Sequence, residues 1–376
     1  MPAAQDSIMK TFFAIALLGT ATLASAKDEA AKDEAGAWLT TATTVGVPGA
    51  GITLPIAAGG LSLTQTNEFS NKGKGIDDVA QFKTPDSAIF VTAYIYRPTY
   101  ADAALTAYAT GEAINVEFGG SAVLSDHGTV AFGGQPDGAI RRVYTGGRLK
   151  GEALATAAAF ARVGGWIVKL RASGPAVRQA DVVAALDAFV AGTRVDKKAI
   201  VYPVAELPLD PPCPAPSAPA ALLVHDKNAG ADALFAAMVG GSAMEPSSRA
   251  KAMERIAFPA NGTRRACLRG TVRLGQRTLS VLQPAGETAP AIILLPFNDA
   301  GGIMAIEKGI LGTGYVIKTY AIGAIETRGS IDRLPSIAQL EGWLGTRGAA
   351  PIAVRSRTVF DAKGNTTINI DPSALK

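Results

Sequence analysis

Residues 153–192, ALATAAAFARVGGWIVKLRASGPAVRQADVVAALDAFVAG, predict a β-hairpin that leads directly into a helix. Two apolar runs flank Gly164-Gly165, and a pair of glycines between extended segments favours a tight turn. After Pro175, the apolar side chains between residues 182 and 190 recur at helical spacing, so they form one buried stripe. A hairpin followed by such a helix is typical of an antiparallel sheet with a helix packed on it, and therefore of an α+β fold.

The segments before this hairpin show a similar mixture of strand and helix patterns. Leu61–Thr66 alternates apolar and polar side chains, as a half-buried strand does. Residues 88–96 are rich in β-branched and aromatic side chains and are followed by Pro98, which ends a strand. Residues 100–113 are rich in alanine and predict a helix. The other strands predicted in this half are 76–82, 129–132 and 139–144.

The predicted order of elements over about residues 50 to 195 is strands, helix, strands, helix. This order, together with the final strand–helix pair at 166–192, resembles the PsbP/Mog1-like fold, an antiparallel sheet covered by helices. Members of that fold are mostly binding and assembly factors. The resemblance therefore implies a binding role rather than catalysis, as an analogy between folds.

A proline-rich stretch divides the chain. Residues 203–219 contain seven prolines, which favour extended polyproline conformation and exclude a helix or a central strand. A chain of 376 residues also exceeds one ordinary hydrophobic core. We therefore predict two domains, each a mainly antiparallel sheet covered by helices. The predicted segments after the amino-terminal residues are a charged spacer at 27–45, a first α+β domain at 46–198, a Pro-rich linker at 199–222 and a second α+β domain at 223–376.

The second domain is predicted to begin with helices and to continue with strands. The predicted helices are 229–239, 247–256 and 336–344. The predicted strands are 267–274, 278–283, 291–297, 302–308, 314–324, 352–360 and 366–370.

Residues 1–26 are predicted to form a secretory signal peptide. Lys10 supplies the positive charge, residues 12–18 form a short apolar core, and Ala24-Ser25-Ala26 has the small side chains that signal peptidase requires. The apolar core is shorter than the ~20 residues that span a bilayer, and no later segment reaches that length. We expect a periplasmic or secreted protein with no transmembrane segment after cleavage. The sequence leaves open whether Met1 or Met9 is the natural start.

The two cysteines, Cys213 and Cys267, are predicted to form a structural disulfide. An isolated pair in an oxidising compartment usually bridges. A redox pair would favour the spacing Cys-x-x-Cys, and a metal site would need further cysteine or histidine ligands nearby. Neither feature is present, so we predict no metal and no cofactor.

The charge of the chain is mildly basic and locally concentrated. The net charge of +4 is too small to indicate nucleic-acid binding. Arginines gather near the start of the second domain, however, at Arg264, Arg265, Arg269, Arg273 and Arg277. On a strand at 267–274, Arg269, Thr271 and Arg273 would share one face. We predict an anion-binding site at Arg265, Arg269 and Arg273, for an anionic envelope component or a partner protein; the alternative is a solvated face paired with neighbouring acids.

Only two histidines, His127 and His225, offer a general base near neutral pH. Each adjoins an aspartate, but the composition around each is also typical of a turn or a helix cap. The sequence therefore predicts no catalytic residue. Our leading interpretation is an exported non-enzymatic protein that binds or supports partners through its surfaces. The alternative is a periplasmic hydrolase of unrecognised type that uses His225 or His127.

Overall fold

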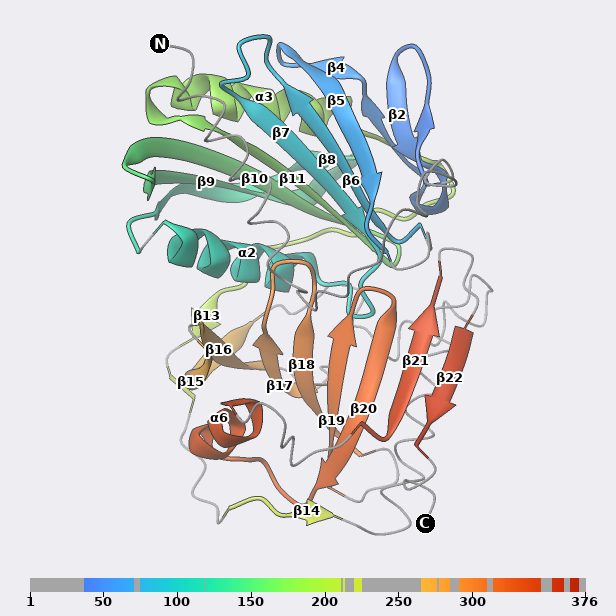
Figure 1. The fold of residues 1–376 in the computed structure, drawn as a ribbon, viewed down its shortest axis with the longest axis vertical. Coiled ribbons are helices and arrows are strands. Elements are labelled where there is room, and N and C mark those ends of the chain that lie inside the picture. The colour runs from blue at the N-terminus through green and yellow to red at the C-terminus, as the bar shows by residue number, and fades with distance from the viewer. Residues whose placement is uncertain are drawn as a thin grey trace, which may run out of the picture. The chain divides into compact units, whose positions relative to one another are not determined.

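The computed structural model describes three sheets and a few helices (Figure 1). The described residues are 37–70, 75–118, 120–210, 212–213, 220–224, 265–275, 277–284, 291–309, 314–345, 354–361 and 366–371. Contacts within the chain group Glu34–Lys376 into one compact unit.

The first two sheets are formed by residues before 196. The smaller has the order β1-β2-β3-β12, with β1 at Leu39–Thr40, β2 at Thr44–Val47, β3 at Ile52–Pro55 and β12 at Arg194–Val195. The larger has eight strands in the order β4-β5-β6-β7-β11-β10-β9-β8. Their bounds are β4 Ala57–Ala58, β5 Leu61–Glu68, β6 Asp77–Lys83, β7 Phe90–Tyr96, β8 Val123–Phe132, β9 Gln135–Leu149, β10 Glu152–Val163 and β11 Trp166–Pro175. Every pairing described in these two sheets is antiparallel.

The hairpin predicted around Gly164-Gly165 is confirmed. β10 and β11 pair without interruption from Val163 opposite Trp166 to Leu154 opposite Pro175. Gly164 has a φ of 55°, in the left-handed region that a glycine adopts without strain. The tight turn therefore fixes the register of β10 and β11, two adjacent inner strands of the eight-stranded sheet.

Two helices contact this sheet. α2 (Ala103–Glu117) begins at Asp102, whose buried carboxylate accepts hydrogen bonds from the N–H groups of Ala104 and Leu105. α3 (Gln179–Gly192) follows a short 3-10 turn, η3 (Ala176–Arg178), and buries the predicted apolar stripe. Of the predicted stripe, Val182, Leu186, Phe189 and Val190 are buried in the core that α3 shares with the sheet, whereas Val183 is partly buried; Ala185 completes the buried face.

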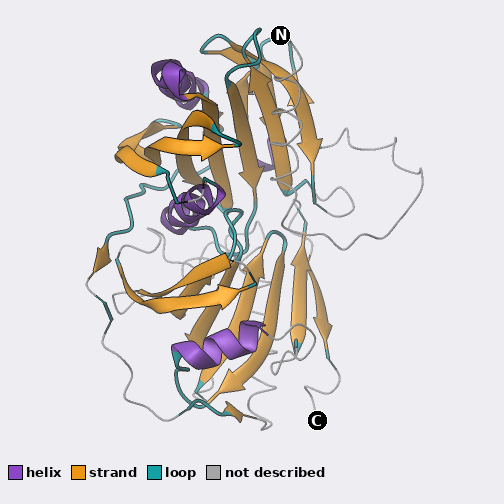
Figure 2. Ribbon diagram, turned by 60° about the vertical axis from the view of Figure 1, so that its left-hand side comes forward, coloured by secondary structure: helices purple, strands orange, loops and turns teal. Residues whose placement is uncertain are grey.

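The third sheet lies in the second half of the chain and has the order β13-β15-β16-β17-β18-β19-β20-β21-β22, with β14 paired to β20. The bounds are β13 Leu209–Asp210, β14 Leu223–Val224, β15 Ala266–Leu274, β16 Arg277–Pro284, β17 Ala291–Pro296, β18 Ile303–Lys308, β19 Tyr315–Ala321, β20 Ala324–Ile331, β21 Ser356–Phe360 and β22 Thr366–Ile370. The pairing of β13 with β15 is parallel, and the others described are antiparallel. One helix, α6 (Ile337–Gly345), packs against β15 (Figure 2).

The two larger sheets share a hydrophobic core. It joins α2, through Leu105 and Ala107, to Leu282 of β16 and Phe360 of β21. Polar contacts accompany this core. The hydroxyl of Tyr108 donates to Ser280 Oγ at 2.8 Å.

The predicted fold class is confirmed in part. The sheets are mainly antiparallel, as expected, but sheet predominates and the described helices contact only some of the strands. The prediction that helices cover each sheet is therefore not met in the described residues. The helices predicted at 229–239 and 247–256 lie outside them, and the division into two domains stays a prediction. No helix in the described ranges combines the length and the apolar character that crossing a bilayer requires.

Candidate functional site

One edge of the eight-stranded sheet is formed by β8. It pairs with β9 on one side, and no described strand pairs with its other side. The ladder is regular only over the five residues Asp126–Val130, because the register shifts between Leu124 and Asp126 and again between Val130 and Phe132. The unpaired side of this short segment presents backbone N–H and C=O groups that are not used in the sheet.

A groove of about 480 Å³ lies between the end of β8 and the second half of α3. The residues that line it are Val130, Ala131, Phe132, Gly133, Gly134, Arg141, Asp187, Val190, Ala191 and Thr193. Its walls are thus largely apolar, and its charged groups come from β9 and α3. A concave surface with a few placed charges has the composition of a binding site.

Arg141 lies in the floor of this groove, between two carboxylates. Its Nε donates to Oδ1 of Asp187 at 2.9 Å, and its Nη1 donates to Oδ2 of Asp126 at 2.7 Å. The arginine side chain is only 16% exposed, whereas those of Asp126 and Asp187 are 62% and 49% exposed. Burial acts to lower the pKa of Arg141, but the hydrogen bonds and charges of both aspartates raise that pKa above its ordinary value. The trio therefore exposes two carboxylates around one partly buried cation.

The middle of the edge strand is open above Arg141. Gly128 pairs with Arg141 in the register of β8 and β9. A Cβ atom built on Gly128 would meet no atom within 4 Å, and Gly128 does not have a positive φ. The space beside the guanidinium is therefore available to a side chain from outside.

His127 lies within β8, not in the turn that its neighbours in sequence predicted. Its side chain is 57% exposed, with Nδ1 3.7 Å from Oε1 of Glu206. The same carboxylate accepts hydrogen bonds from the buried Arg142, which also donates to the carbonyl of Ala107. No hydrogen bond described in the structure joins His127 to a serine. His225 lies outside the described residues, and the hydrolase alternative stays a prediction.

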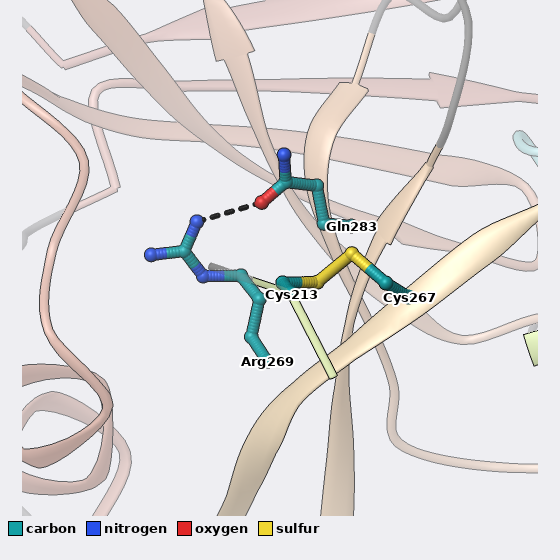
Figure 3. Close-up of a disulfide and its surroundings, with 4 residues drawn as sticks. All are labelled: Cys213, Cys267, Arg269 and Gln283. Carbon is teal, nitrogen blue, oxygen red and sulfur yellow. Dashed lines mark hydrogen bonds between the residues drawn. A yellow bond between two sulfur atoms is a disulfide. The ribbon is translucent and has the colours of Figure 1, made fainter. Parts of the chain in front are cut away.

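The predicted anion-binding arginines have separate partners. Arg265 donates to Oδ1 of Asp210 at 2.6 Å. Arg269 donates to Oε1 of Gln283 at 2.8 Å (Figure 3). The register shift between Leu268 and Gly270 leaves Arg269 as an additional residue opposite β16. This bulge interrupts the alternation that would have placed Arg269 beside Thr271 and Arg273. Burial lowers the pKa of Arg269, and Arg273 is exposed. Anion binding at Arg265, Arg269 and Arg273 stays a prediction.

The predicted disulfide between Cys213 and Cys267 is confirmed (Figure 3). Their Cα atoms are 5.2 Å apart. Cys267 lies in β15 beside Asp210 of β13, and the N–H of Cys213 donates to the carbonyl of Leu268. The disulfide therefore attaches the proline-rich stretch to the edge of the third sheet.

The comparisons with known proteins give a loose likeness of fold. No model of a known protein family matches the chain, and no curated protein matches it. Among solved structures it is similar to the solution structure of cyanobacterial PsbP (CyanoP) from Synechocystis sp. PCC 6803. The two are 14% identical, the match covers 47% of this chain and all of that one, and the TM-score is 0.30. This is a weak resemblance of fold and carries no argument about function.

The groove beside β8 was not found from the sequence. Its charged lining residues, Arg141 and Asp187, are 46 positions apart in the chain, and Asp126, which bonds Arg141, belongs to an Asp-His-Gly sequence with the composition of a turn. One signal was available. Arg141 and Arg142 are adjacent in a segment predicted to be a strand, and neighbouring side chains of a strand point to opposite faces, so at least one of the two arginines needs a partner on the packed side of the sheet.

Proposed function

We propose that the chain is an exported, non-enzymatic binding protein that holds a partner in the groove between β8 and α3. The observation that carries the proposal is the groove itself, an apolar concavity with a partly buried guanidinium and two exposed carboxylates, beside a strand edge with which no described strand pairs. These groups recognise charge and backbone. The described residues that line the groove include no nucleophilic side chain with a basic group beside it.

Work outside the cytoplasm is supported by two independent features. The predicted signal peptide at 1–26 would direct the chain to the secretion machinery. The disulfide between Cys213 and Cys267 is of the kind that persists in an oxidising compartment. Amino-terminal sequencing of the natural protein tests this part of the proposal, and a mature end at Lys27 is the expected result.

Site-specific photocrosslinking tests the groove. A photoreactive residue at Ala191, an exposed position in the groove wall, should give a discrete adduct with a partner in the source organism. The same residue at Val177 is the matched control, because that position is 95% exposed and precedes the opposite end of α3. Adducts that are equal at both positions, or absent from Ala191, would contradict the proposal.

A further inference from the structure

We infer that the occupant of the groove is an extended peptide that pairs with β8 as a ninth strand and places a lysine or arginine side chain against Asp126 and Asp187. This inference rests on the proposed function and specifies the chemistry of the partner. Three features of the groove carry it: the unpaired backbone, the distribution of charge and the alternation of polar and apolar surface.

The backbone of β8 provides the first feature. An edge strand binds an extended peptide through main-chain hydrogen bonds, whatever the sequence of that peptide. The regular segment Asp126–Val130 allows about five residues of pairing. The register shifts at both of its ends twist the edge away from the ladder, so a longer strand cannot continue the pairing.

The charge of the groove provides the second feature. Arg141 is shared by two aspartates, so the trio has a formal charge of −1 when all three groups are ionised. The side chain of Arg141 is 16% exposed, whereas those of Asp126 and Asp187 are 62% and 49% exposed, so an approaching side chain meets the negative groups first. Oδ1 of Asp126 is not engaged by Arg141, which bonds Oδ2. A basic side chain is therefore the complementary group.

The alternation of polar and apolar surface along the groove provides the third feature. Alternate side chains of a strand point to the same face, so a peptide on β8 directs every second side chain toward the groove. Gly128 leaves space for one such side chain beside the carboxylates. Further along, Val130, Val190 and Ala191 form an apolar wall. The expected sequence has a basic residue and an apolar residue two positions apart.

The same charges argue against a second copy of this chain as the occupant. Antiparallel pairing of two β8 edges over their regular segments would put Asp126 of one copy opposite Val130 of the other. A carboxylate covered by an apolar side chain loses hydration without gaining a partner, which is unfavourable. The basic peptide is therefore the occupant to which we commit, and dimer formation is an outcome that the experiment would reveal.

The test uses three synthetic pentapeptides and the 15N-labelled mature chain with its disulfide intact. The probe is acetyl-Thr-Lys-Thr-Val-Thr-amide, which places Lys and Val on one face of a strand. One control replaces Lys with Glu, and the other, acetyl-Thr-Lys-Val-Thr-Thr-amide, separates Lys and Val onto opposite faces. Titration by NMR gives the affinity and identifies the backbone amides that respond.

The probe should shift amides of Asp126–Val130 and protect alternate ones from hydrogen exchange. The Glu control should bind about 3- to 10-fold more weakly, as expected for exposed ion pairs, and addition of salt should reduce the difference. In the Asp126→Asn variant the affinity for the probe should fall by a similar factor. Asp137→Asn is the matched control, because this carboxylate lies on the same hairpin and accepts a hydrogen bond from Thr129 instead.

Several results would overturn the inference. They are no response of the β8 amides at millimolar probe, equal affinity for the Lys and Glu peptides, or a concentration-dependent dimer that buries β8. If Ala191 still gives a crosslinked partner together with any of these results, the proposed function would be supported. The basic extended peptide would then be excluded as the occupant. Absence of both the adduct and the NMR response would remove both.

Discussion

Asp78 is a fully buried carboxylate in β6, and neither of its oxygens has a hydrogen-bond partner in the described structure. Burial, together with the nearby charges of Glu68 and Asp77, raises its pKa to about 8. The residue is therefore held as the neutral acid at neutral pH. Its titration links the stability of the folded chain to pH.

The sign of this linkage follows from the two pKa values. In the unfolded chain the carboxyl has its ordinary pKa of 3.8, and in the folded chain about 8. Between these values the folded state keeps a proton that the unfolded state has lost. This group therefore makes the free energy of unfolding fall as pH rises, by at most about 1.4 kcal/mol per pH unit.

Asp78→Asn should remove that dependence. We expect the variant to resemble the native chain near pH 4 and to be more stable by roughly 2–5 kcal/mol at pH 8. Urea unfolding at several pH values measures the effect. Asp86→Asn is a control at an exposed carboxylate whose pKa is lowered, chiefly by its hydrogen bond to Thr84. An identical pH profile for native chain and Asp78→Asn would contradict the burial argument.

At the scale of elements, the disulfide is the most testable feature. Cys213 and Cys267 are separated by 54 positions, and closing such a loop stabilises a fold by about 4 kcal/mol in the chain-entropy model. The double variant Cys213→Ser, Cys267→Ser should lose up to that amount in urea unfolding. Addition of reductant should destabilise the native chain and leave the variant unchanged. Equal stability of the oxidised native chain and the variant would contradict a structural role.

Elements with strong local signals could be predicted from the sequence, and those fixed by distant contacts could not. β10, β11 and α3 were found because Gly164-Gly165 marks the turn and the apolar stripe of α3 has helical spacing. β19 and β20 were read as one strand at 314–324. Gly323 in fact turns the chain there, with a φ of 62°.

The candidate sites show the same limit. The disulfide was predictable because two cysteines leave a single intramolecular pairing. The bulge at Arg269 was not, since a bulge depends on how the partner strand pairs. The groove was missed because Asp126 and Asp187 are brought to Arg141 by the hairpin and the helix together. The spacing of these three residues in the sequence does not indicate that their side chains come into contact.

At the scale of the whole molecule, an ion pair between a buried lysine and a partly exposed aspartate links the two larger sheets. Lys169 of β11 donates to Oδ2 of Asp299 at 2.8 Å and lies over the ring of Tyr94. Burial acts to raise the pKa of Asp299, but the charge and hydrogen bond of Lys169 lower it below its ordinary value. Asp299 therefore stays ionised beside the ammonium of Lys169.

A double-mutant cycle measures the coupling between the two groups. Asp299→Asn alone should destabilise the chain by about 3 kcal/mol, because it leaves a buried ammonium without its counter-ion. Adding Lys169→Met should recover much of the loss. The exposed pair of Arg178 and Asp86 is the control cycle, and its coupling should lie within about 1 kcal/mol of zero. Strictly additive effects at Lys169 and Asp299 in urea unfolding would contradict the link.

The proline-rich stretch at 203–219 contacts the first half of the chain as well as the third sheet. Leu207 is buried in the core that the two larger sheets share, and the N–H of Val204 donates to the carbonyl of Asp137. Composition alone predicted an extended linker. Composition could not indicate that such a segment packs, because polyproline conformation is set locally whereas burial depends on the surfaces nearby.

The register shifts at the two ends of the regular segment of β8 have a consequence for evolution. A long, flat and unprotected margin would allow copies of the chain to stack into fibres, which is a hazard for any secreted protein that reaches high local concentration. Interrupting the ladder after five residues leaves a patch too short to propagate. Substitutions within this short segment can therefore accumulate during evolution without creating an edge long enough for amyloid-like stacking.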